Sequence, residues 1–158
     1  MKIKHIGWFL VALVVIVVVA VFVSQKWAHA PIDLATARPV AYSGGATVDM
    51  IEVTTPLPGT AISSPLVISG FARGPWYFEA SFPVTLTDGD GLIIAEGPAQ
   101  AQGEWMTTDR VPFTISLNFA VPANADAFGR RGTLILKNDN PSGDPARDMA
   151  VEIPVLFK

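Results

Sequence analysis

Residues 111–121 read VPFTISLNFAV and decide the fold class of this 158-residue chain. Every second residue of this stretch is a large apolar one, and small or polar residues lie between them. The apolar residues are Val111, Phe113, Ile115, Leu117, Phe119 and Val121. Successive side chains of a strand point to opposite faces of a sheet, so this alternation predicts a strand with one buried and one solvated face.

The same period of two recurs on both sides of this stretch and predicts six further strands. They span residues 48–54, 66–72, 82–86, 92–95, 133–137 and 151–157. The segment 88–91, DGDG, predicts a tight turn that makes a hairpin of the third and fourth of these, because glycine adopts the positive φ angles of such turns. Pro154 lacks a backbone donor and predicts an edge position or a bulge. The fold class expected is therefore all-β, an immunoglobulin-like β-sandwich of about seven strands over residues 47–158.

The N-terminal part of the chain has a different pattern. Residues 6–23, IGWFLVALVVIVVVAVFV, contain no charge and no proline. As a helix they would cover about 27 Å, close to the thickness of a bilayer core, which predicts one transmembrane helix ahead of the sandwich. Lys2 and Lys4 precede the run, so residues 1–5 are expected in the cytoplasm and the C-terminal domain outside it. Residues 24–46 are rich in Ala, Ser, Gly and Pro and predict a linker.

The fate of this N-terminal segment has two alternatives. Residues 28–30, AHA, resemble a signal-peptidase site and would allow cleavage after Ala30. The apolar run is longer than the roughly 7–15 residues usual in a signal peptide, and Pro31 follows the site directly. A single-pass anchor that stays attached is the favoured interpretation.

Composition excludes several classes of chemistry. The chain has no cysteine, and its two histidines, His5 and His29, lie in or beside the anchor. The predicted domain therefore lacks the residues of a Ser-His-Asp triad, a Cys-His pair or a zinc site. From residue 47 onward seven Lys or Arg stand against thirteen Asp or Glu, a formal charge of −6 that disfavours nucleic acid as a partner. A carboxylate pair among Glu79, Glu104 and Asp109 has no supporting motif, so we expect no catalysis and no cofactor.

Three aromatic residues in or beside predicted loops have two interpretations. Trp76, Tyr77 and Trp105 could stack on sugar rings, which would make the domain a glycan- or peptidoglycan-binding module. Alternatively they close the ends of the core, where each ring removes roughly 150–250 Å² from water. Arg73 and Arg110 are expected to pair with neighbouring carboxylates.

The segment 138–148, NDNPSGDPARD, could be a calcium loop or a turn between the last two strands. The ligand frame of an EF-hand fails here, because its twelfth position is Met149 where a bidentate glutamate is required. Asn138, Asp139 and Asn140 instead fit turn chemistry, in which Asx side chains bond to nearby backbone. No metal is expected, and these three residues stay candidates for contact with a partner.

Four phrases in order carry a family resemblance. They are SPLVISGFARG at 64–74, WYFEASFPV at 76–84, WMTTDRVPF at 105–113 and GTLILKNDNPSG at 132–143. Together they resemble the immunoglobulin-like domain of bacterial spore germination, the GerM-associated domain, over residues 48–158. The resemblance implies a non-catalytic β-sandwich on the outer side of a bacterial membrane and supplies no ligand-binding residues. The function expected is a membrane-anchored module that contacts an envelope protein or glycan.

Overall fold

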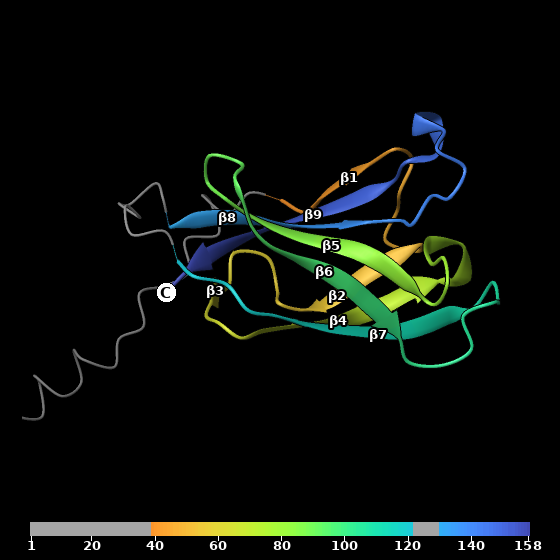
Figure 1. Ribbon diagram of the computed structural model, residues 1–158, viewed down its shortest axis with the longest axis horizontal. Coiled ribbons are helices and arrows are strands. Elements are labelled where there is room, and N and C mark those ends of the chain that lie inside the picture. Colours follow the sequence, from red (N-terminus) through yellow and green to blue (C-terminus); the bar gives the residue numbers. More distant parts are fainter. Residues whose placement is uncertain (1–38, 122–129) are drawn as a thin grey trace, which may run out of the picture. The chain divides into compact units, whose positions relative to one another are not determined.

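The computed structural model describes residues 39–121 and 130–158, and these form an all-β domain (Figure 1). Its strands are β1 (Ala41–Ser43), β2 (Ile51–Thr55), β3 (Ala61–Ile62), β4 (Leu66–Arg73), β5 (Ser81–Asp88), β6 (Ile93–Ala101), β7 (Arg110–Leu117), β8 (Arg131–Lys137) and β9 (Ala150–Phe157). Two short 3-10 helices are η1 (Gly74–Trp76) and η2 (Pro145–Arg147). The all-β prediction is confirmed, and each of the seven predicted strands overlaps an observed one.

The strands belong to one continuous, curled sheet rather than to two separate ones. Their order is β1-β9-β8-β5-β6-β7-β4-β2, with β3 added beside β9. Neighbouring strands are antiparallel except β3 and β9, which are parallel. The sheet curls so that β9, β8 and β5 form one layer and β7, β4 and β2 form the other (Figure 1). The architecture is thus sandwich-like, and β6 links its two layers.

Strand β6 joins the layers because its two edges have different neighbours. One edge pairs with β5 along most of the strand, and the other edge pairs with β7 only at the last two residues. At this end the Ala101 amide donates to the Ala80 carbonyl at 2.8 Å, and the Gln102 amide donates to the Pro112 carbonyl at 2.8 Å. Gly97 lies in the middle of β6, and a Cβ there would lie only 3.3 Å from Ile115 of the facing layer. A residue without a side chain therefore lets β7 approach β6 closely.

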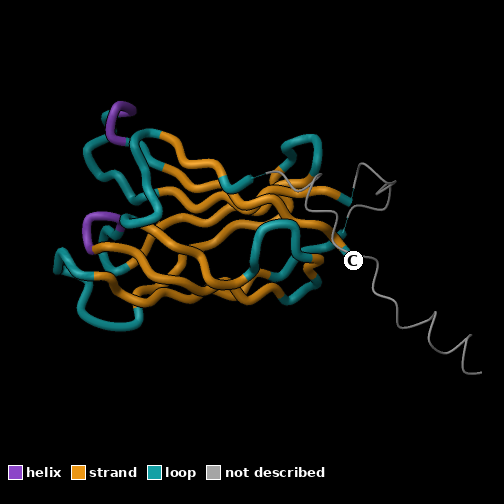
Figure 2. Tube along the Cα trace, turned by 180° about the vertical axis from the view of Figure 1, so that it is seen from behind, coloured by secondary structure: helices purple, strands orange, loops and turns teal. Residues whose placement is uncertain are grey.

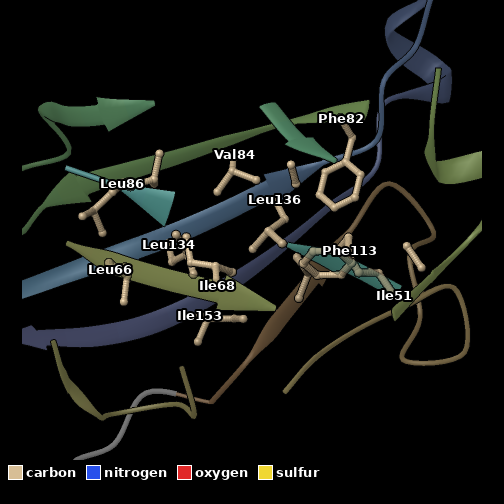
Figure 3. Close-up of a cluster of buried hydrophobic side chains, with 14 of the residues drawn as sticks. Ile51, Leu66, Ile68, Phe82, Val84, Leu86, Phe113, Leu134, Leu136 and Ile153 are labelled. Atoms are coloured by element: carbon tan, nitrogen blue, oxygen red, sulfur yellow. The ribbon is translucent and has the colours of Figure 1, made fainter. Parts of the chain in front are cut away.

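Alternate residues of each long strand fill the space between the layers. In β4, for example, Leu66 and Ile68 are buried while Val67 and Phe71 are exposed. Figure 3 shows side chains of β2, β4 and β7 facing those of β5, β8 and β9. The labelled ones are Ile51, Leu66, Ile68, Phe82, Val84, Leu86, Phe113, Leu134, Leu136 and Ile153. Burial of this apolar face is what specifies the register of the strands.

The strand that decided the fold class is shorter than its pattern predicts. β7 ends at Leu117, while the alternation of apolar residues continues to Val121. The Phe119 amide donates to Ser64 Oγ at 3.0 Å and not to a neighbouring strand. The Phe119 ring still packs on Phe157, with centroids 5.6 Å apart, but Val121 is 38% exposed. The alternation therefore indicates which side chains pack on the core, including the partly buried Phe119, and not where the strand ends.

The predicted linker over residues 24–46 is wrong at its C-terminal end. Residues 41–43 form β1, which pairs with β9 in the register Tyr42↔Val151, and Ala46 belongs to the core. All three β1 residues are exposed, so this strand has no alternation of buried and exposed residues. It is held by backbone hydrogen bonds, which side-chain patterns do not reveal.

Pro154 lies within β9 at a place where its missing donor costs no ladder bond. The Pro154 carbonyl accepts from the Gly59 amide at 2.7 Å, on the side of β3. The N–H and C=O of one strand residue point to the same side, so the proline nitrogen faces away from β8. On that outer side the pairing with β1 reaches Glu152 and the pairing with β3 starts at Leu156. β9 is therefore an edge at Pro154 itself, because β1 pairs with it only before this residue and β3 only after it. In this local sense the predicted edge position is confirmed.

No helix within residues 39–121 and 130–158 is long and apolar enough to cross a membrane. The predicted transmembrane segment 6–23, the predicted cytoplasmic residues 1–5 and the possible cleavage after Ala30 lie outside the described residues.

The core makes a quantitative prediction at Phe82, which is fully buried among other aromatic rings. We expect Phe82→Ala to lower the free energy of unfolding by about 3–5 kcal/mol, because it removes buried surface and leaves a cavity. The matched control is Phe71→Ala on the outer face, where the ring is 39% exposed and the loss should be about 1 kcal/mol or less. Denaturant unfolding of the full chain in mild detergent, followed by tryptophan fluorescence, measures both. Equal losses would contradict the assignment of Phe82 to the core.

Candidate functional site

Three loops gather at one end of the domain and bring the predicted site residues together. They are residues 74–80 between β4 and β5, 102–109 between β6 and β7, and 138–149 between β8 and β9. We call these three segments the loop end. Figure 1 shows them on the right of the domain, and Figure 2 shows both 3-10 helices at the same end from behind. The Asp139 amide donates to the Trp76 carbonyl at 3.0 Å and so connects the first and third loops.

Trp76 and Tyr77 belong to the core and offer no ring face to a ligand. Their side chains are 1% and 4% exposed. Both rings contact Phe82, Trp76 edge-on at 6.5 Å and Tyr77 tilted at 5.3 Å between centroids. The Tyr77 hydroxyl donates to the Val111 carbonyl at 2.9 Å, and burial raises the pKa of Tyr77 to about 12. The sugar-stacking interpretation therefore loses two of its three aromatic residues, and the core interpretation describes them.

Trp105 has a different position, because it is only half-buried against the core. It lines a shallow depression of about 530 Å³ at the loop end, together with Pro75, Tyr77 and Met106. The remaining lining consists of Gly74, Thr107 and Thr108. Met106 is 74% exposed, the highest value among the large apolar residues described. This residue was missed by the sequence analysis, since an apolar residue beside tryptophan carries no signal of exposure.

Close packing on Gly74 positions the second loop. A Cβ at Gly74 would lie 1.8 Å from the Thr107 carbonyl oxygen and 2.5 Å from that of Trp105. Within the loop, Glu104 Oε1 accepts from the Met106 amide at 3.0 Å, and the Thr107 amide donates to the Trp105 carbonyl at 2.8 Å. Such local bonds satisfy backbone groups that no strand pairs. The exposed residue Met106 is therefore presented by an ordered turn.

Ion pairs occupy the two arginines nearest to this loop, as predicted. Arg73 binds Asp49 through two nitrogens, at 2.8 and 3.0 Å, and donates from Nη1 to the Thr108 carbonyl at 2.7 Å. This arrangement lowers the pKa of Asp49, chiefly through the hydrogen bond from Arg73. Arg110 pairs with Glu52, and its guanidinium lies 5.5 Å from the centroid of the Phe71 ring. Both pairs are exposed to solvent, so they neutralise charge more than they stabilise the fold.

The loop 138–149 uses the side-chain amide of Asn138 to close itself. Asn138 is buried, its Nδ2 donates to the Arg147 carbonyl at 3.1 Å, and its Oδ1 accepts from the Met149 amide at 2.7 Å. Asn140 also turns inward, donating to the Asp144 carbonyl at 2.8 Å and to Asp148 Oδ1 at 2.8 Å. These bonds describe turn chemistry, and they leave neither amide available for a partner.

Metal-binding geometry is not seen at this loop or elsewhere in the described part of the chain. Within residues 39–121 and 130–158, no three His, Cys, Asp or Glu side chains converge as they would around a metal ion. Asp139 differs from its neighbours, because it lines a second shallow depression of about 560 Å³ together with residues of β5 and β6. Pro83, Pro98 and Glu96 lie around the same depression.

Gly74 provides a test of how the loop end is built. We expect Gly74→Ala to lower the free energy of unfolding by about 1–3 kcal/mol, because the new methyl group collides with backbone oxygens. It should also speed cleavage by chymotrypsin after Trp105, since the loop 102–109 must move away. Gly103→Ala in the same loop is the matched control, because a Cβ there meets nothing within 4 Å. If both variants resist chymotrypsin like the parent chain, the close packing does not hold this loop.

Comparison with known proteins gives one finding about the family. A family model described as the immunoglobulin-like domain of bacterial spore germination matches residues 50–142. No curated protein and no solved structure matches the chain. The matched range runs from the residue before β2 into the loop ahead of β9, so the sheet extends beyond it by β1 and β9. Since the match covers more than half of its residues, the chain belongs to the family of the immunoglobulin-like domain of bacterial spore germination.

Proposed function

We propose that the chain is a membrane-anchored, extracytoplasmic module that performs no chemistry and binds another component of the bacterial cell envelope. The observation that carries the proposal is the construction of the loop end. Ordered loops expose Met106 and part of Trp105 there. Two polar groups near them, the Tyr77 hydroxyl and the Arg73 guanidinium, are already bonded within the domain. A surface of this kind favours recognition over bond making.

The chemistry of the domain also supports a binding role. Residues 47–158 contain no histidine and no cysteine, which removes the commonest nucleophiles and general bases. Burial raises the pKa of the Tyr77 hydroxyl from 10.0 to about 12, which makes this group less available as a base at neutral pH than an ordinary tyrosine. The amide side chains of Asn138 and Asn140 form bonds within their own loop. An immunoglobulin-like scaffold that presents loops at one end is a common arrangement for binding.

The N-terminal sequence and the family support a location of the sandwich domain on the outer side of the membrane. The eighteen apolar residues 6–23 are long enough to span a bilayer, and Lys2 and Lys4 precede them. The description of the family, a domain of bacterial spore germination, is consistent with a role in the cell envelope. We therefore propose that residues 1–5 lie in the cytoplasm and that the sandwich lies on the outer side.

Because the chain has no cysteine, single cysteines can report its topology. Ser63 is exposed and makes no hydrogen bond through its side chain in the described residues, so Ser63→Cys should leave the fold unchanged. In intact spheroplasts we expect a membrane-impermeant maleimide to label Ser63→Cys fully. The matched variant Lys2→Cys should be labelled only after the membrane is permeabilised. Labelling of position 63 that requires permeabilisation would contradict the proposed topology.

A further inference from the structure

We propose that the depression beside Trp105 and Met106 is the docking site for a basic segment of a partner protein that carries an apolar side chain. This inference rests on the proposed function and names the chemistry of the partner. Three observations support it: an exposed apolar surface, carboxylates beside that surface, and nearby arginines that are bound to other carboxylates.

The depression of about 530 Å³ presents an apolar surface. Pro75, Trp105 and Met106 are among the residues that line it, and Met106 is largely exposed. This surface lies on backbone that is fixed by the close approach of the loop to Gly74. A large apolar side chain of a partner can therefore be received without reordering of the loop, which reduces the entropic cost of binding.

The turn that carries Met106 has an acidic residue at each end. Glu104 precedes Trp105 and Met106, and Asp109 follows Thr108. Neither carboxylate forms a salt bridge with any residue that the structure describes, although Glu104 accepts a hydrogen bond from the Met106 amide and Asp109 acts on the nearby Arg73. Two carboxylates without a salt bridge beside an apolar surface are complementary to Lys or Arg placed beside an apolar anchor.

The nearby arginines offset these charges only in part. The pKa of Arg73 is raised chiefly by its hydrogen bond to Asp49 and to a lesser extent by Asp109. The hydrogen bonds of Arg73 go to Asp49 and to the Thr108 carbonyl, and Arg110 is bound to Glu52. Residues 47–158 carry a formal charge of −6 in total. The field at the turn is therefore negative, which attracts basic chains and disfavours a membrane surface of anionic lipids.

Two other exposed surfaces fit a protein partner less well. On the outer face of β4 the Phe71 ring is partly covered by Arg110, which is itself paired. Along β6, the backbone groups of Glu96 and Pro98 point away from β5, since the Ala101 amide points to β5 and the Gln102 amide to β7. No strand among residues 39–121 and 130–158 pairs with β6 at these two positions on that side. A charged residue and a proline on a free edge block the addition of a strand.

The experiment uses the full chain in dodecyl maltoside and measures the fluorescence anisotropy of a labelled nonapeptide, GSKLKFKSG. We expect this peptide to bind, and the acidic analogue GSELEFESG and the polar analogue GSKSKSKSG to bind at least about fivefold more weakly. Raising the salt concentration from about 20 to 300 mM should weaken binding, because exposed charges are screened.

Two variants assign the binding to this turn. The double variant Glu104→Gln and Asp109→Asn should weaken binding about fivefold, and Gln keeps the oxygen that accepts from the Met106 amide. Met106→Ser should weaken it by a similar factor. The matched control is Glu96→Gln with Asp139→Asn, which removes two carboxylates from the other depression and should change the affinity by less than about twofold.

The inference is overturned if the basic peptide does not bind, if the control pair weakens binding as much as the loop pair, or if chitotriose displaces the peptide. The last result would assign the depression to sugar. Cysteine labelling at position 63 separates this failure from that of the proposed function. If position 63 is labelled from outside while the peptide does not bind, the docking assignment is wrong and the proposed topology stands.

Discussion

The packing of four aromatic rings between the two layers is the interaction on which the rest of this structure depends. Phe82 lies at its centre, with the Phe113 ring at 5.0 Å and the Tyr77 ring at 5.3 Å between centroids, and Trp76 packs edge-on against it. Phe113 comes from the layer opposite to Phe82, so the cluster holds the curled sheet closed. The chain has no cysteine, and its domain therefore relies on such burial without any disulfide.

This cluster also determines what the loop end can present. Trp76 and Tyr77 lie in the short connection after β4 and turn into the core, which fixes residues 74–77 against the loop that carries Trp105. The Trp76 carbonyl then accepts from Asp139 and positions the loop before β9. Residues that are buried for stability thus order the loops, and Met106 is left exposed on a rigid surface. Rigid presentation of a few side chains is what a binding module of the immunoglobulin type requires.

Much of the fold could be predicted from the sequence, because burial in a sheet produces an alternation of residues. The seven long strands, the position of Pro154 and the pairing of both arginines follow from local patterns and charge. Strand β1 could not be predicted, since its three exposed residues are held only by backbone bonds to β9. The sequence also did not predict that the strands form a single curled sheet, because only two residue pairs between β6 and β7 connect its two layers. At the site, the sequence left a core position and a binding surface as alternatives for Trp76 and carried no signal for the exposure of Met106, because both depend on tertiary packing.

The most direct test of the central claim, that the turn at Met106 contacts a protein partner, is photo-crosslinking in intact cells of the native host. p-Benzoylphenylalanine would replace Met106 in one strain and Val67, exposed on the outer face of β4, in another. The account predicts a protein adduct from position 106 that disappears when Glu104→Gln and Asp109→Asn are added, and none from position 67. An adduct from position 67 alone, or one from position 106 that persists in the double variant, would contradict it.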